Sequence, residues 1–158
     1  MKSLGSSPVT NLLVIGYGNT LRGDDGVGPR VAEAIEELHL TGVRTLSCGL
    51  LTPELAEPIS KARCVVFVDA AIDKDGKTQL RPLSPADSAQ IMAHAADPRT
   101  MLALARDVFG HVPRAWWLTI PAQNLEIGEE FSTRAKVGLR DAIAEIKKIL
   151  PQEPASAC

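Results

Sequence analysis

Residues 11–31 read NLLVIGYGNTLRGDDGVGPRV, and this stretch decides the fold. The apolar run LLVI stops at a glycine, as a short buried strand does. Apolar residues then recur at helical spacing from Val27 to Leu38, and Pro29 falls in the first turn, where its missing N–H costs little. Between the two lies a loop rich in glycine with two adjacent aspartates, Asp24 and Asp25. The stretch therefore predicts a strand, an acidic loop and a helix in direct succession.

The same alternation continues along the chain. Apolar and β-branched runs predict further strands at residues 43–47, 64–70, 77–82 and 115–121, the third of these at a sheet edge. Helix starts are predicted at 52–55, 84–87 and 97–100, and a long last helix over about 129–150. Strands that alternate with helices indicate the α/β class, here an α/β/α sandwich with a mostly parallel sheet.

The size and the charge balance limit the possible functions. With 158 residues the chain fits one domain, with an ordered core over about 11–150 and a flexible tail at 151–158. A formal charge of −2 offers no excess of basic residues for a nucleic acid or an anionic membrane. No apolar stretch approaches the ~18 residues that span a bilayer, and the N-terminal residues lack the apolar core of a signal peptide. The three cysteines form no CxxC pair, which favours a reduced, cytoplasmic setting without disulfides.

A dinucleotide site is disfavoured in the first loop. The dinucleotide-binding fingerprint G-x-G-x-x-G needs a third glycine where this chain has Leu21. The acidic residue that would bind the ribose at the end of the second strand is also missing, since Ser47 and Cys48 stand there. Asp24 and Asp25 would also repel a pyrophosphate. A simpler alternative stays open, in which Asp25 caps the following helix and Asp24 adds favourable charge at its positive end.

Asp25 and Asp69 both follow predicted strands, and these two strands are the first and third along the chain. If those strands are neighbours, the two carboxylates face one cleft, since ligands bind at the carboxyl ends of strands in open α/β sheets. His94 would complete an oxygen, oxygen, nitrogen set suited to zinc, nickel or manganese. A turn or capping role for each aspartate and a surface role for His94 stay open at this point.

The chain resembles the hydrogenase maturation proteases, which trim the large subunit of nickel–iron hydrogenases. The family pattern G-x-G-N-x-L-x-x-D-[ED]-G-x-G matches Gly16–Gly28, and a strand ending in D-A matches Val65–Ala70. A later histidine before a proline and a helix ending in G-x-x-P match His94, Pro98 and Gly110–Pro113. The resemblance implies a twisted five-stranded sheet between helical layers, with residues 77–82 as the antiparallel strand.

The resemblance further implies that Asp25, Asp69 and His94 are the metal-contacting and catalytic residues. The metal would be nickel already inserted in the hydrogenase large-subunit precursor, with zinc or another divalent ion as a possible substitute. The implied reaction is removal of a C-terminal peptide from that precursor. Asp24 is then expected to cap the helix.

The chain departs from the family pattern at two places. Many members have glutamate at Asp25, and many have D-G-G-T where this chain has Ser47–Leu50. The residues after Leu50 resemble the branch that serves bidirectional, NAD-coupled hydrogenases. Two alternatives stay open: a nickel-binding chaperone without hydrolytic activity, and a thiol protease built on Cys48 or Cys64. Of Trp116 and Trp117, one is expected in the core and the other either in the core or on a precursor-binding surface.

Overall fold

The computed structural model describes residues 10–72, 76–87 and 97–150. Its five strands form one sheet in the order β2-β1-β3-β5-β4. The strands are β1 (Thr10–Tyr17), β2 (Val43–Cys48), β3 (Ala62–Ala71), β4 (Gln79–Leu83) and β5 (Arg114–Pro121). All neighbouring pairs are parallel except β4 and β5, which are antiparallel. The predicted α/β class and the antiparallel edge strand are confirmed.

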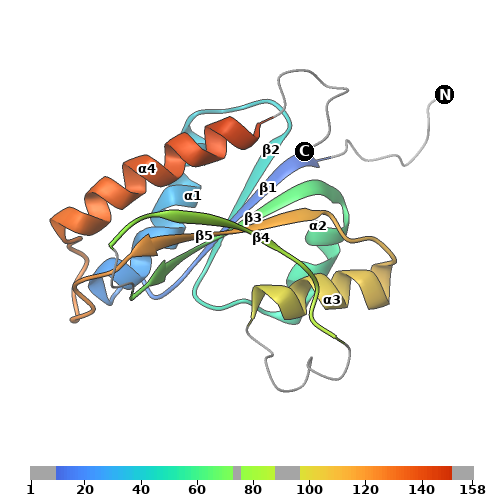
Figure 1. The fold of residues 1–158 in the computed structure, drawn as a ribbon, viewed down its shortest axis with the longest axis horizontal. Coiled ribbons are helices and arrows are strands. Elements are labelled where there is room, and N and C mark those ends of the chain that lie inside the picture. Colours follow the sequence, from blue (N-terminus) through green and yellow to red (C-terminus); the bar gives the residue numbers. More distant parts are fainter. Residues whose placement is uncertain (1–9, 73–75, 88–96, 151–158) are drawn as a thin grey trace.

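Helices cover both faces of the twisted sheet (Figure 1). Helices α1 (Val27–Glu37) and α4 (Thr133–Ile149) lie on one face, and α2 (Ala56–Ser60) and α3 (Pro98–Phe109) lie on the other. Two short 3₁₀ helices, η1 (Gly23–Gly26) and η2 (Pro53–Leu55), precede α1 and α2. The three-layer α/β/α sandwich is therefore confirmed.

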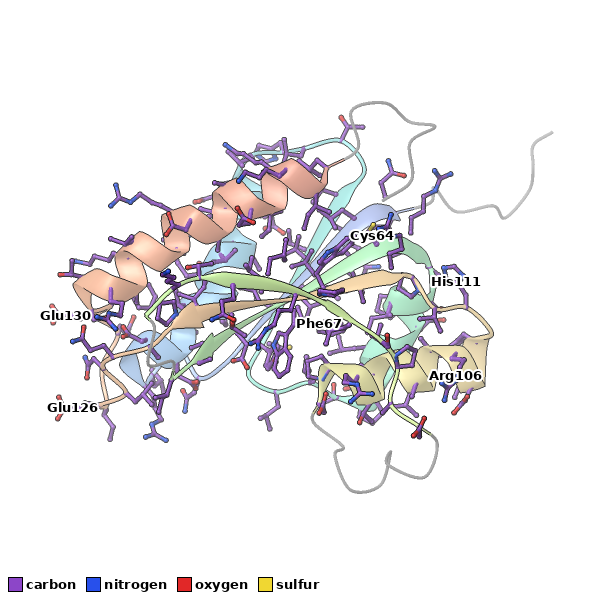
Figure 2. The ribbon with its side chains drawn as sticks, in the orientation of Figure 1. Cys64, Phe67, Arg106, His111, Glu126 and Glu130 are labelled. Carbon is purple, nitrogen blue, oxygen red and sulfur yellow. The ribbon has the colours of Figure 1, made fainter. Side chains whose placement is uncertain are left out.

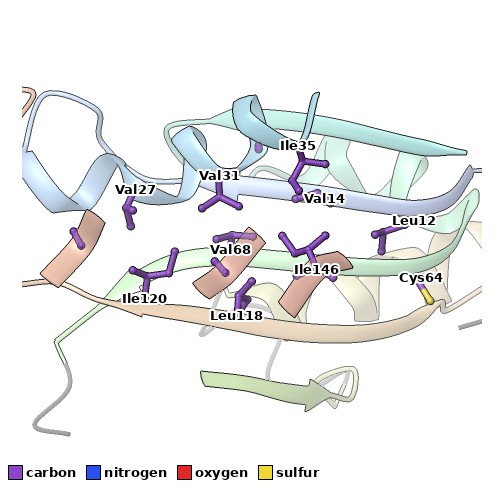
Figure 3. Packing of buried hydrophobic residues seen from close by; sticks show 14 residues of the cluster. Leu12, Val14, Val27, Val31, Ile35, Cys64, Val68, Leu118, Ile120 and Ile146 are labelled. Carbon is purple, nitrogen blue, oxygen red and sulfur yellow. The ribbon is translucent and has the colours of Figure 1, made fainter. Parts of the chain in front are cut away.

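Two hydrophobic clusters fill the space between these layers, and the two-residue period of the strands assigns side chains to them. In β1, Leu12 and Val14 point towards α1 and α4, whereas Leu13 and Ile15 point towards α2 and α3. Figure 3 shows the first cluster. In it, every second side chain of β1, β3 and β5 packs on the face of the sheet that carries Val31 and Ile146. Both clusters contain residues of the three central strands, so these strands are packed on both faces.

The helix boundaries differ from the prediction at three places. The last helix begins at Thr133, and its Ser132 cap accepts a hydrogen bond from the backbone N–H of Ala135 at 3.1 Å. Residues 84–87 are not helical, and the remainder of that predicted helix lies outside the described residues. The segment from Thr52 to Lys61 opens with a 3₁₀ turn rather than an α-helical one. In contrast, α3 begins as predicted, because the Asp97 carboxylate accepts from the backbone N–H of Arg99 at 2.7 Å.

The cysteines correct one expectation. Cys48 is free, but Cys64 is disulfide-bonded, so the expectation of a chain without disulfides is wrong.

The two tryptophans pack on opposite faces of the sheet. Trp116 contacts the cluster that includes Leu12 and Val14, here called the α1/α4 cluster. Trp117 contacts the cluster that includes Leu13 and Ile15, here called the α2/α3 cluster. Across residues 10–72, 76–87 and 97–150, no helix combines the length and the apolar character that crossing a membrane requires.

Candidate functional site

The candidate site lies where the order of the strands reverses. From β1 the chain proceeds to β2 on one side, then crosses to β3 on the other side. Strands β1 and β3 are parallel neighbours, with Gly16 paired to Val68 at the carboxyl end. Such a reversal opens a crevice beyond the ends of the two strands. The expectation that the first and third strands are adjacent in the sheet is thus confirmed.

Glycines allow the loop after β1 to fold tightly against α1. Gly18 has a φ of 143°, and a side chain there would collide with the backbone carbonyl of Asp25. A Cβ on Gly16 would collide with the carbonyl of Gly28, at the start of α1. The close approach of strand, loop and helix therefore requires glycine, and it sets the position of the backbone that carries Asp25.

Asp25 is half-buried in η1, and its Oδ2 accepts a hydrogen bond from the backbone N–H of Asn19 at 2.7 Å. The N-terminal cap of α1 is Gly26, and no side chain makes a capping hydrogen bond there. The alternative in which Asp25 caps α1 is therefore wrong. Its carboxylate is held by the loop and lies close enough to Asp69 for its charge to raise the pKa of that residue.

Asp69 lies near the end of β3 on the face that carries α2 and α3. Burial raises the pKa of its carboxyl to about 6, against the lowering effect of a hydrogen bond from Tyr17, and the nearby charge of Asp25 raises it further. A cation placed near both carboxylates would offset the repulsion that Asp69 experiences from Asp25. The structure thus brings Asp25 and Asp69 together, and their chemistry fits a divalent metal.

Asp24 has a different role from the one that the sequence predicted. Its side chain is fully buried and does not cap α1. Its carboxylate accepts four hydrogen bonds, from the backbone N–H groups of Gln123 (2.7 Å), Asn124 (2.9 Å) and Ser132 (2.8 Å) and from the Ser132 hydroxyl (2.6 Å). Burial opposes the charged form, but these hydrogen bonds outweigh it and lower the pKa of Asp24. Asp24 therefore joins the first loop to the segment between β5 and α4.

Backbone hydrogen bonds strengthen the same junction. Gly23 donates to the carbonyl of Gly128 at 2.8 Å, Gly128 donates to Leu21 at 2.8 Å, and Asp24 donates to Asn124 at 2.7 Å. Figure 2 shows Glu126 and Glu130 on this second segment, at the end of the molecule where α4 begins. The loop that carries Asp25 is thus fixed by α1 on one side and by residues 122–132 on the other.

His94 lies outside the described residues, so its predicted contribution stays a prediction. The described chain resumes at Asp97, whose charge is close enough to raise the pKa of Tyr17. The start of α3 therefore lies near Tyr17. Among the residues that the structure describes, no group of three or more His, Cys, Asp and Glu side chains could hold a metal ion. Asp25 and Asp69 are two candidate ligands, and a complete metal site would need a further donor from outside this group.

Sequence reasoning missed Tyr17, the last residue of β1. The Tyr17 hydroxyl donates to the Asp69 carboxylate. Burial is the main cause that raises the pKa of Tyr17, and the charge of Asp69 and this hydrogen bond raise it further. The signal was present in the period of the strands: Leu13, Ile15 and Tyr17 alternate along β1 on the face where Asp69 lies. Only the register between the strands, however, turns this alternation into a contact.

A groove of about 560 Å³ lies beside the first loop, next to the carboxyl end of β2. Its lining includes Asn19, Leu21, Cys48 and Leu50, of which Leu21 and Leu50 are largely exposed. Burial raises the pKa of the Cys48 thiol, which disfavours the thiolate that a nucleophile needs. Cys64 is fully buried and disulfide-bonded, so neither cysteine supports a thiol protease.

Solved structures share this fold. A hydrogenase 2 maturation peptidase from Thaumarchaeota archaeon SCGC_AB-539-E09 has a TM-score of 0.68 at 20% identity, over 90% of this chain and 99% of that one. The nickel–iron hydrogenase maturation protease HycI from Thermococcus kodakarensis KOD1 has a TM-score of 0.69 at 24% identity, over 88% and 91%. The maturating endopeptidase HybD from E. coli has a TM-score of 0.67 at 20% identity, over 86% and 89%.

Sequence comparison adds one curated relative. The hydrogenase expression/formation protein HupM from Azotobacter chroococcum mcd 1 is 37% identical over 68 residues, which is 42% of this chain. The match spans 32% of HupM, about a third of that protein. No model of a known protein family matches the chain.

Proposed function

We propose that this chain is a hydrogenase maturation protease, an endopeptidase that removes a C-terminal peptide from the nickel-loaded large-subunit precursor of a nickel–iron hydrogenase. The observation that carries the proposal is the meeting of Asp25 and Asp69 at the β1/β3 reversal, within a fold that solved maturation proteases share. The partial match to HupM supports the same assignment.

The proposed metal-contacting and catalytic residues are Asp25, Asp69 and His94. The charge of Asp25 acts on Asp69, which favours a divalent cation near both carboxylates, and His94 would add the nitrogen ligand. Nickel is here part of the substrate, so the site tests whether the precursor has been loaded. A metal ion can polarise a scissile carbonyl or lower the pKa of a bound water, and a carboxylate not bound to metal can instead act as general base.

Three finer assignments belong to the same proposal. Zinc or another divalent ion can replace nickel at the carboxylates, since the donor set does not distinguish them. The residues after Leu50 favour the branch that serves bidirectional, NAD-coupled hydrogenases. We place the reaction in the cytoplasm, where the precursor is made.

The test is intact-mass analysis of a large-subunit precursor after incubation with this protein. Precursor loaded with nickel and verified by metal analysis is compared with the same precursor without nickel. We expect loss of a C-terminal peptide only from the loaded form. Asp69→Ala serves as the matched inactive enzyme, and cleavage regardless of nickel would exclude a nickel-sensing role for Asp25, Asp69 and His94.

The second candidate is a nickel-binding chaperone with the same ligands and no hydrolysis. The two carboxylates favour it as much as they favour the protease, because both functions need the same metal contact. Complex formation with the loaded precursor, without any change in precursor mass over hours, would favour the chaperone and contradict the protease.

A further inference from the structure

Tyr17 is placed beside Asp69 by the register of the two central strands. In the parallel pair β1 and β3, Leu13 is opposite Val65 and Ile15 is opposite Phe67. The same register, continued by two residues, places Tyr17 opposite Asp69. Neighbouring strands lie about 4.8 Å apart, and the side chains of such a pair share one face of the sheet. The phenol hydroxyl and the carboxylate make a hydrogen bond there.

The Tyr17 hydroxyl is a hydrogen-bond donor. A phenol has an ordinary pKa of about 10, so it carries its proton at neutral pH. The ring packs against the α2/α3 cluster, which limits its rotation. The indole N–H of Trp117 is buried and makes no hydrogen bond within the described residues. Within that part of the chain, the Asp69 carboxylate is the acceptor for the Tyr17 hydroxyl.

With the proposed function as its premise, we propose that Tyr17 is a positioning residue that orients the Asp69 carboxylate for the metal ion. A carboxylate at the end of a strand can rotate about its last side-chain bond. The hydrogen bond from Tyr17 occupies one acceptor position and restricts this rotation, which leaves the remaining lone pairs for the cation that Asp25 also faces. Hydrogen bonds to metal ligands of this kind typically change metal affinity or activity by about 10–100-fold when removed.

The chain offers an unusually clean probe, because Tyr17 is its only tyrosine. Full-length protein grown with 3-fluorotyrosine therefore gives a single fluorine resonance from this ring. We expect Zn²⁺, used alone as the probe ion, to shift that resonance in the wild-type chain and not in Asp69→Asn. A resonance that Zn²⁺ leaves unmoved in the wild type would overturn the inference.

The affinity test uses Tyr17→Phe, which removes the hydroxyl and keeps the ring in its cluster. Calorimetric titration with Zn²⁺ should show binding weakened by about 10–100-fold. Trp116→Phe is the matched control, since Trp116 packs on the opposite face of the sheet and should leave the affinity unchanged. Circular dichroism and thermal unfolding verify that both variants fold. Equal affinity in Tyr17→Phe and wild type, or no zinc binding by the wild type, contradicts the inference.

Cleavage of the nickel-loaded precursor separates this inference from its premise. If the wild type cleaves and Tyr17→Phe cleaves with the same kcat and KM, the positioning role is wrong and the proposed function stands. If the wild type does not cleave but Tyr17→Phe binds Zn²⁺ more weakly, the proposed function is wrong and the positioning role stands. We expect a higher KM in Tyr17→Phe, because the nickel that Asp69 would contact is part of the precursor, together with a lower kcat if the metal also takes part in the reaction.

Discussion

At the scale of single residues, the adjacent aspartates of the first loop have separate roles. Asp24 is buried and accepts hydrogen bonds from a segment about 100 positions away in the sequence, whereas Asp25 is held by the backbone of its own loop and lies near Asp69. Successive side chains of a loop point in different directions. One residue can therefore anchor the loop while the next presents its carboxylate to the crevice.

We predict that Asp25→Ala, Asp69→Ala and His94→Ala each reduce precursor cleavage by on the order of 10³-fold or more, because each removes a metal ligand of the proposed site. The melting temperature should change little, since Asp25 and Asp69 are only half-buried. Cleavage rates and thermal unfolding measured on the same samples check both parts. A variant that trims the loaded precursor at the wild-type rate would remove that residue from the mechanism.

Asp25→Glu is the matched control for this series. Glutamate keeps the charge and is common at this position in the family that the chain resembles. The extra methylene changes the reach of the carboxylate, so we expect partial activity, well above that of Asp25→Ala. Activity no higher than that of Asp25→Ala would mean that the loop tolerates only the shorter side chain.

Asp24→Asn should destabilise the fold by about 2–4 kcal/mol at neutral pH, because an amide cannot accept all the hydrogen bonds that the carboxylate accepts. The folded-state pKa of Asp24 is lowered, so its stabilising effect is present above the unfolded-state pKa of about 4. That effect is lost as the pH falls through the folded-state value. Urea unfolding of both proteins at pH 7 and near pH 3 measures it. A difference in stability that does not shrink in acid would contradict this assignment.

At the scale of elements, the start of α1 is pressed against the ends of β1 and β3. A Cβ on Gly28 would collide with the carbonyl of Val68 and lie 2.7 Å from that of Tyr17. This contact sets the distance between the helix, the first loop and the strand that ends at Asp69. The position of the candidate site therefore depends on a residue that has no side chain.

We predict that Gly28→Ala destabilises the protein by about 1–3 kcal/mol and lowers cleavage further than the loss of folded protein explains, because the helix must move away from the strands. Gly49→Ala is the control, since a Cβ there meets no atom within 4 Å. Thermal unfolding and cleavage rates are measured for both. Equal effects of the two substitutions would show that the close packing at Gly28 is not required.

At the scale of the whole molecule, both hydrophobic clusters share the central strands. Side chains of β1, β3 and β5 alternate between the α1/α4 cluster and the α2/α3 cluster. If either layer of helices separates from the sheet, the apolar side chains on one face of β1, β3 and β5 become exposed to water. The two halves of the sandwich are thereby coupled.

We predict one cooperative unfolding transition, with the calorimetric enthalpy equal to the van't Hoff enthalpy. Differential scanning calorimetry of the full chain checks this, and it also tests the expectation of a single domain. Two resolved transitions would mean that the layers unfold separately.

Hydrogen exchange should follow the strand order β2-β1-β3-β5-β4. Backbone amides of β1 and β3 should be the most protected, and those of the edge strands β2 and β4 should exchange faster, because edge strands open without breaking the centre of the sheet. Exchange measured by mass spectrometry or by NMR resolves the strands. Faster exchange in β3 than in β2 would contradict this order.

Local chemistry in the sequence determined much of the fold. Apolar runs identified all five strands, and Asp97 with Pro98 identified the start of α3. These signals are local, because strand period and helix capping depend on residues a few positions apart. The start of α4 was predicted four residues early, at Glu129, because the apolar stripe extends beyond the cap at Ser132.

The contacts of the candidate site residues were decided by the tertiary structure. Asp25 and Asp69 were each visible at the end of a predicted strand, but their meeting required β1 and β3 to be neighbours. The hydrogen bonds from Gln123, Asn124 and Ser132 to Asp24, and that from Tyr17 to Asp69, join segments that only the folded sheet brings together. Sequence patterns record which residues can form an element. Contacts between elements depend on strand order and register, which arise from the packing of the whole chain.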